Sequence, residues 1–211
     1  MASYRGHLTF AGLLGAGYGS LALLDGGGDW EQALFAAGLT TLGGLLPDLD
    51  SDSGVPVREL FSAAAAITPI LLFDRVKDLC QQSTEQTLFV LAAIYLFIRY
   101  VLSYIFKAFT VHRGMFHSLP ALGIAGLTTY LLYPSDEVRR RLFLSGAVML
   151  GFLSHLVLDE IYSVDFMGAR LHLNKYAGSA LKLFSKSWSA TLTTYLLLAL
   201  LAWRVWLGGR G

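Results

Sequence analysis

Hydrophobic residues along the chain gather in seven stretches, which short polar connectors separate. A helix that crosses the hydrocarbon layer needs about 20 mostly apolar residues, with about 17 as the lower limit. The pattern predicts an all-α fold, a polytopic membrane helix bundle with about seven hydrophobic helices, in a single membrane-embedded domain over residues 1–211. The stretches are Leu8–Leu24, Trp30–Leu46, Leu60–Phe73, Thr87–Ile105, Leu119–Tyr133, Leu142–Leu158 and Ala190–Leu207.

Two of these stretches, the third and the fifth, are short and contain Pro69 and Pro120. Each is short enough to be tilted, re-entrant or buried within the bundle. In the first stretch, Gly12, Gly15 and Gly19 place small residues along one side. Such spacing predicts a face on which two membrane helices pack closely.

The composition agrees with a membrane protein and excludes several other classes. Hydrophobic residues make up 55% of the 211 residues and charged residues only 15%, whereas soluble domains carry about 25% charged residues. The net charge of +1 argues against a protein that binds nucleic acid by neutralising phosphates. The single cysteine, Cys80, excludes an internal disulfide framework and a cysteine-rich metal site. The expected partner is therefore the lipid bilayer and not nucleic acid.

Polar residues of one chemical type, histidine and aspartate, cluster at the ends of four stretches. If the seven stretches cross the membrane alternately, the start of the first, the end of the second, the start of the fifth and the end of the sixth share one membrane face. Ionisable groups at such positions are costly unless they are paired or bound, so we expect one shared site. The clusters are His7; Asp48, Asp50 and Asp52; His112 and His117; and His155 with Asp159.

Histidine and aspartate without cysteine are typical ligands of zinc, manganese or iron. His155 and Asp159 are four residues apart and project from one helical face, although a structural His–Asp hydrogen bond explains that pair equally well. Arg113, between His112 and His117, could hold a phosphate or a carboxylate, or pair with an aspartate of the site.

The leading hypothesis is a membrane-bound metal-dependent hydrolase that acts on a phosphoester such as a phospholipid. Its cofactor would be a divalent metal, zinc or alternatively manganese or iron, as one ion or more, because such ions activate water and bind phosphoester oxygens. Asp50, Arg113 and Asp159 are the candidate catalytic residues, with Arg113 holding the anionic group and a carboxylate serving as general base. The candidate metal ligands are His7, Asp48, Asp50, His112, His117, His155 and Asp159.

Three alternatives differ in chemistry. A calcium loop would place ligands at Asp48, Asp50, Asp52 and Glu59, but Ser53 stands where that loop needs glycine. Transport of a divalent ion would require acidic residues midway through spans, whereas the clear mid-span charge is that of an arginine, at position 99. The alternative to an enzyme is a membrane protein with a metal-stabilised polar core that binds a regulatory protein partner.

The last connector is basic, with Arg170, Lys175, Lys182 and Lys186. Its segment Ala180–Phe184 could lie at the lipid surface, where a positive rim would attract the head groups of an anionic lipid substrate. The ordinary lysine bias of membrane topology explains these charges as well. Basic residues number eight on the side of the shared site and seven on the other, which favours a cytoplasmic site only slightly.

Four segments together resemble the YdjM-like family of bacterial inner-membrane metal-dependent hydrolases of the LexA-binding type. They are Gly6–His7, Leu46–Asp50, His112–Ser118 and Ser154–Asp159, and the resemblance covers residue 6 to about residue 186. It implies a multi-pass location in the inner (cytoplasmic) membrane. The family is distantly similar to zinc-dependent phospholipase C and P1 nuclease proteins, which implies a helical site that cleaves phosphoesters, with His155 and Asp159 in their His-x-x-x-acid element.

Overall fold

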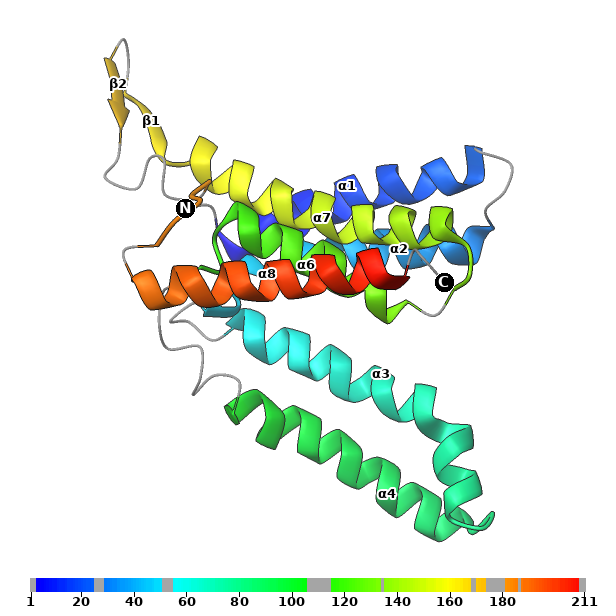
Figure 1. Ribbon diagram of the computed structural model, residues 1–211. Helices are drawn as coiled ribbons and strands as arrows, with labels where there is room; N and C mark the ends of the chain where they lie inside the picture. The colour runs from blue at the N-terminus through cyan, green and yellow to red at the C-terminus, as the bar shows by residue number, and fades with distance from the viewer. Residues whose placement is uncertain are drawn as a thin grey trace. The chain divides into compact units, whose positions relative to one another are not determined.

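The computed structural model describes most of the chain and shows a helical protein (Figure 1). It describes residues 3–24, 29–50, 55–105, 115–133, 135–167, 170–173, 181–185 and 187–208. Within these residues there are seven α-helices, and four helical segments are long and apolar enough to cross a membrane: Tyr4–Leu24, Thr84–Ile105, Val138–Ile161 and Trp188–Gly208. The prediction of an all-α membrane protein with about seven hydrophobic helices is confirmed.

The described residues fall into two compact units. The first comprises Met1–Asp48 and Gly114–Gly211, and the second comprises Leu49–Arg113. The first unit contains α1 (Tyr4–Leu24), α2 (Trp30–Gly43), α6 (Leu119–Leu132), α7 (Val138–Ile161), α8 (Trp188–Gly208) and a hairpin of β1 (Val164–Met167) and β2 (Arg170–Leu173). The second contains α3 (Val55–Leu79), α4 (Thr84–Leu96) and the π-helix η2 (Phe97–Leu102), and the 3-10 turn η1 (Pro47–Asp50) spans the boundary. Organisation as a single domain stays a prediction.

Helix α1 packs closely on α2 because glycines line the contact. A Cβ atom at Gly15 would lie 2.6 Å from the carbonyl oxygen of Ala37, and one at Gly19 would meet that of Ala33. A Cβ at Gly12 would have no atom within 4 Å. Two of the three glycines of the predicted packing face therefore make the close approach, as small residues do between membrane helices.

Helix α7 approaches α2 in the same way, with the middle of α7 against the C-terminal end of α2. A side chain at Gly43 would strike the backbone of Val148, and one at Gly151 would strike the backbone of Thr40. An apolar cluster of fully buried side chains lies closer to the N-terminus of α7. It consists of Ala36, Leu144 and Ala147. Helices α1, α2 and α7 therefore form the tightly packed centre of the first unit.

The start of α6 is defined by a capping serine and by proline in the first turn. The Ser118 hydroxyl accepts a hydrogen bond from the amide of Ala121 at 3.3 Å, which satisfies one of the free amides at a helix N-terminus. Pro120 lies in the first turn, where its missing amide costs nothing. Ser118 and Pro120 therefore define the start of α6, and the connector before it ends one residue after His117.

In the second unit, α3 is longer than predicted. The hydrophobic pattern predicts Leu60–Phe73, whereas the helix runs from Val55 to Leu79 and passes through Pro69. Proline removes one backbone hydrogen bond but is tolerated in membrane helices whose backbone groups are satisfied nearby. After α3, Gln81 and Gln82 adopt positive φ angles of 51° and 66° and reverse the chain into α4.

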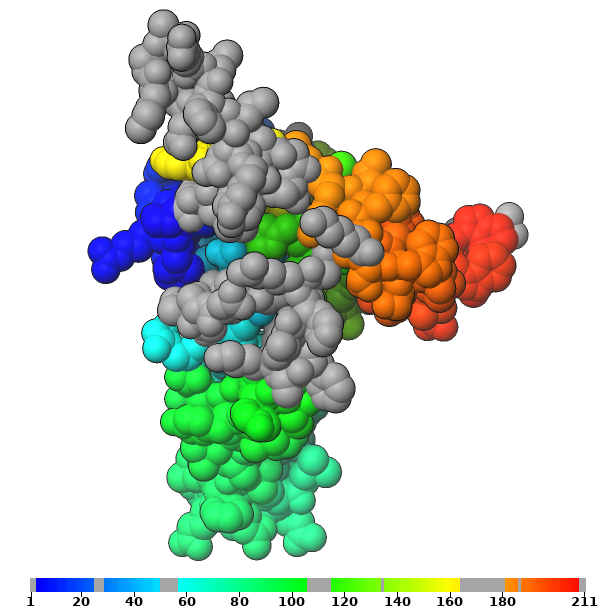
Figure 2. All heavy atoms as spheres, turned by 90° about the vertical axis from the view of Figure 1, so that its left-hand side faces the viewer, coloured from blue at the N-terminus to red at the C-terminus, as the bar shows by residue number. Residues whose placement is uncertain are grey.

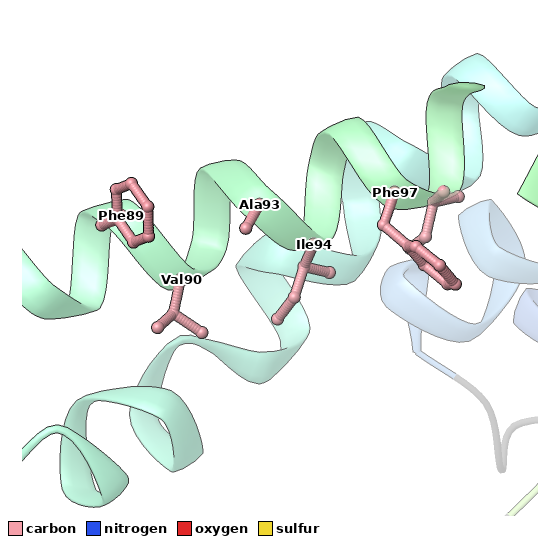
Figure 3. Close-up of a pocket in the computed structure, with 6 residues that line it drawn as sticks. Phe89, Val90, Ala93, Ile94 and Phe97 are labelled. Atoms are coloured by element: carbon pink, nitrogen blue, oxygen red, sulfur yellow. The ribbon is translucent and has the colours of Figure 1, made fainter. Parts of the chain in front are cut away.

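The outer surface of α4 and η2 is apolar over its whole middle part. Figure 3 shows a shallow pocket lined by Phe89, Val90, Ala93, Ile94 and Phe97, with Ile98 alongside. All six side chains belong to the candidate span Thr84–Ile105. A surface of this kind on a membrane helix is typical of contact with lipid chains.

Candidate metal centre

Histidine and aspartate side chains from four segments of the first unit lie together at one end of its helices. His7 is in the first turn of α1, Asp48 is in the 3-10 turn after α2, and His117 immediately precedes the cap of α6. His155 and Asp159 are in the last two turns of α7. In Figure 1 the start of α1, the start of α8 and the end of α7 lie at this same end.

The cluster is buried on one side and more open on the other. The side chains of His155 and Asp159 are 0% and 3% exposed, and His7 is also buried. Asp48 and His117 are 20% and 14% exposed. The more open side of the cluster is therefore that of Asp48 and His117, while His155 and Asp159 form its floor.

Four nitrogen–oxygen distances in the cluster are too long for hydrogen bonds. The Nε2 atoms of His117 and His155 are each 3.5 Å from Asp48 Oδ1 and 3.7 Å from Asp159 Oδ2. Hydrogen bonds between N–H and oxygen measure about 2.7–3.2 Å. Ligand atoms around a tetrahedral zinc ion, with bonds of about 2.0–2.2 Å, are roughly 3.3–3.6 Å apart. The observed spacing is closer to that of atoms that share an ion.

A backbone hydrogen bond fixes the tautomer of His155. Its Nδ1 atom lies 2.7 Å from the carbonyl oxygen of Gly44, and because a carbonyl only accepts, Nδ1 carries a proton. When the ring is neutral, its Nε2 atom directs a lone pair toward Asp48 and Asp159. A lone pair facing two carboxylates is repelled unless a cation lies between them. Metal-binding histidines typically donate their other N–H to a carbonyl or carboxylate in this way.

His7 supports the floor of the cluster through Asp159 and His155. Its Nε2 atom is 3.2 Å from Asp159 Oδ1, and its ring stacks on that of His155 with centroids 3.6 Å apart and an angle of 10°. The buried Nδ1 of His7 has no hydrogen-bond partner among the described residues. His7 thus offers a nitrogen to an ion, or orients the Asp159 carboxylate that does so.

Two overlapping groups of side chains in this cluster could hold a metal ion. One is His7, Asp48 and His155, and the other is His117, His155 and Asp159. Within each group, one ligand atom from each residue lies within 4.8 Å of the others. His155 belongs to both groups, which makes it the central residue of the site.

Asp48 remains ionised in this environment. Partial burial acts to raise the pKa of its carboxyl, but the positive charge of the nearby His117 and His155 imidazoles, when these are protonated, outweighs burial and holds the pKa well below its ordinary value. An ionised carboxylate is the form that binds a metal.

A comparison with protein-family models decides which family the chain belongs to. The model described as "YdjM inner membrane protein" matches residues 3–209. The chain belongs to the YdjM inner membrane protein family. With its four long apolar helices, it is a multi-pass protein of the inner membrane. No curated protein and no solved structure matches the chain.

In this YdjM-family protein, the structure brings together five of the seven residues predicted as ligands. These are His7, Asp48, His117, His155 and Asp159. The remaining predictions fall on His112, on the side chain of Asp50 and on Arg113, which lie outside the described residues. Their roles as ligand, catalytic carboxylate and anion-binding cation stay predictions.

Glycines also shape the site of this YdjM-family chain, although they were not among the site residues predicted from the sequence. The Gly44 carbonyl orients His155, and Gly151 lets α7 approach the end of α2 closely enough for that hydrogen bond. Two signals were present: the pair Gly43–Gly44 just before the aspartates, and Gly151 one turn before His155. Small residues at such places indicate close backbone approach.

Proposed function

We propose that this protein is a membrane-embedded metal-dependent hydrolase that cleaves phosphoesters. The observation that carries the proposal is the geometry of His155, whose Nδ1–H is held by the Gly44 carbonyl while Nε2 faces Asp48 and Asp159. A buried imidazole with a fixed tautomer and two carboxylates in front of it is typical of a metal site with an ordered outer shell.

The donor set favours zinc, with manganese or iron as alternatives. It consists of imidazole nitrogens and carboxylate oxygens without a thiolate. Catalytic zinc sites commonly have such ligands, whereas structural zinc sites commonly contain cysteine. A divalent ion bound there would act as a Lewis acid on a phosphoester oxygen and lower the pKa of water.

The exposure of each side chain indicates its role in the proposed reaction. Asp159, held by His7 on the buried side, is fixed in position. Asp48 and His117 border the open side, where the substrate would enter. In this proposal Arg113 binds the anionic group of the substrate, and Asp159 or Asp50 accepts a proton from water.

Metal analysis and hydrolysis assays on the same detergent-purified samples test the proposal. We expect the wild-type protein to retain zinc, manganese or iron and to hydrolyse a member of a panel of phosphodiesters and phospholipids. His155→Ala and Asp159→Asn should lose both the metal and the activity. Asp29→Asn is the matched control, because Asp29 caps α2 at the end away from the cluster, and asparagine caps a helix equally well.

Two results would contradict the proposal. One is a wild-type protein that holds no transition metal. The other is hydrolysis that persists in His155→Ala and Asp159→Asn. Metal retention without hydrolysis of any panel member would overturn the hydrolase and favour a metal-stabilised membrane protein that binds a regulatory partner.

A further inference from the structure

The segment Leu181–Phe184 lies directly beside the open side of the metal cluster. The carbonyl of Lys182 accepts a hydrogen bond from the amide of Leu119 at 3.2 Å, and Lys182 forms a parallel bridge with Ser118. Ser118 follows His117 in the chain, and His117 borders the open side of the cluster. The segment is therefore held against the backbone next to a proposed ligand.

Hydrogen bonds from α8 hold the same segment from its other side. The hydroxyl of Tyr195 donates to the carbonyl of Leu183 at 3.2 Å, and the amide of Ser185 donates to the Thr191 hydroxyl at 3.0 Å. The ring of Phe184 also lies against that of Tyr195, with centroids 5.8 Å apart. The segment is thus fixed between the start of α6 and the first turns of α8.

The side chains of this segment face outward and are mostly apolar. Leu183 and Phe184 are 48% and 66% exposed, and Leu181 is exposed as well. Trp188, the first residue of α8, is 76% exposed and continues the apolar patch. In Figure 2 the orange atoms of the segment and of the start of α8 form one projecting surface. An apolar patch of this kind marks contact with another apolar phase, and Lys182 adds a positive charge to it.

The position of the patch along the chain indicates which phase it contacts. The candidate span Trp188–Gly208 begins within a few residues of it. Tryptophan is enriched where a membrane helix enters the head-group layer, and a segment with apolar side chains and a lysine suits that layer. The segment therefore lies at the depth at which the phosphates of a bilayer are found.

We propose that Leu181–Phe184 forms a membrane-contacting lip, through which the site takes phospholipids from the adjacent leaflet. This inference rests on the proposed hydrolase function and names its substrate class as an anionic phospholipid. The apolar side chains of the lip contact acyl chains, and Lys182 attracts the phosphate. Because the lip adjoins His117, a phosphoester held there reaches the open side of the cluster without leaving the membrane surface.

A comparison of two substrates separates the lip from the chemistry of the site. The variant Leu183→Ser/Phe184→Ser is reconstituted into phosphatidylglycerol vesicles and is also assayed with bis(4-nitrophenyl) phosphate in detergent. We expect hydrolysis of the vesicle lipid to fall about tenfold or more, because the lip loses its apolar contact. Hydrolysis of the soluble diester and the metal content should stay at the wild-type level. Leu88→Ser/Phe89→Ser, an exposed pair of the same composition on α4, is the matched control.

Equal losses on both substrates, or no loss on vesicles, would overturn the lip as the route of the substrate.

A fluorescence measurement tests the membrane contact independently of any activity. An environment-sensitive dye is attached to Leu183→Cys in a Cys80→Ser background and compared with the dye at Asp136→Cys, an exposed site in the connector between α6 and α7. We expect a blue-shifted emission, quenched by brominated lipid, only at position 183. Water-like emission there would refute the proposal even if the protein hydrolyses nothing.

Discussion

Gly151 lies one helical turn before His155, at the point where α7 meets the end of α2, and its replacement by alanine tests how the site is positioned. The new methyl group would lie 2.8 Å from the amide nitrogen of Gly44 and the carbonyl carbon of Thr40, and closer still to the Thr40 oxygen. Ordinary van der Waals contact begins at 3.4 Å. The two helices must therefore separate locally by at least about 0.6 Å to relieve these two contacts, and by more to relieve the contact with the Thr40 oxygen.

That separation is enough to damage the site as well as the packing. The hydrogen bond from His155 Nδ1 to the Gly44 carbonyl would lengthen from 2.7 Å to more than about 3.3 Å, beyond the usual range for such bonds. Overpacking of a close contact costs about 1–3 kcal/mol. Loss of an outer-shell hydrogen bond to a ligating histidine lowers metal affinity about 10–100-fold.

Thermal unfolding in detergent and metal titration measure the two effects separately. We expect a lower Tm for Gly151→Ala, by about 2–4 °C for each kcal/mol in a chain of this size, together with weaker metal retention. Gly38→Ala on α2 is the control, because a Cβ there has no atom within 4 Å, and alanine favours a helix by up to about 1 kcal/mol. If Gly151→Ala is as stable and as metal-loaded as Gly38→Ala, the inferred close approach of α2 and α7 is wrong.

Three further predictions concern stability and metal retention. Gly15→Ala should destabilise the protein by about 1–3 kcal/mol, whereas Gly12→Ala should not, because only Gly15 lies against the Ala37 carbonyl; unfolding of the two variants in detergent compares them, and equal Tm values would argue against this contact. Removing the metal with a chelator should lower the Tm of the wild type by more than that of His155→Ala, since an ion that binds only the folded state stabilises it; equal shifts would contradict a site at His155. Metal retention should fall as the pH is lowered, because protons compete with the metal for the imidazole nitrogens. The lowered pKa of Asp48 keeps this carboxylate ionised until the pH falls well below the ordinary carboxyl range, so a loss that begins above that range is assigned to the imidazoles, and retention that does not change as the pH is lowered to about 4 would argue against histidine ligands.

The membrane fold was predictable because the hydrophobic stretches are long and the connectors between them are short. Each of the seven stretches overlaps a helix of the structure. The start of α6 followed from Ser118 and Pro120, which act through local backbone chemistry. The predicted limits of the third stretch, Leu60–Phe73, were too short, because the apolar stretch ends at charged residues through which helix α3 continues.

Two irregular elements had weaker signals. The hairpin of β1 and β2 pairs Val164 with Leu173 and Met167 with Arg170, within a connector that the sequence analysis treated only as a basic loop. The second strand does alternate between polar and apolar residues from Arg170 to Leu173, but four residues are too few to distinguish a strand. The π-helix η2 around Arg99 cannot be recognised from hydrophobic periodicity, because nearly every position in that segment is hydrophobic.

The gathering of the candidate ligands followed from residue type and alternating topology, but their individual contacts did not. Spacing places His155 and Asp159 on one face of α7, yet it does not indicate that His7 would lie against both of them. That contact depends on how closely α1, α2 and α7 pack, which the glycines along these helices determine.

The Gly44 carbonyl has a consequence for how variation in this family will be interpreted. Because the acceptor that fixes the His155 tautomer is a backbone atom, a conventional side-chain substitution does not delete it. An alanine scan of polar residues would find the histidines and aspartates but would miss this contact. Natural chains could change residue 44 and keep the same acceptor, provided that the new side chain avoids Ala11. The contact that orients the His155 ring therefore depends on helix geometry and not on a side chain. The sequence reveals it only through the small residues that permit α2 and α7 to approach closely.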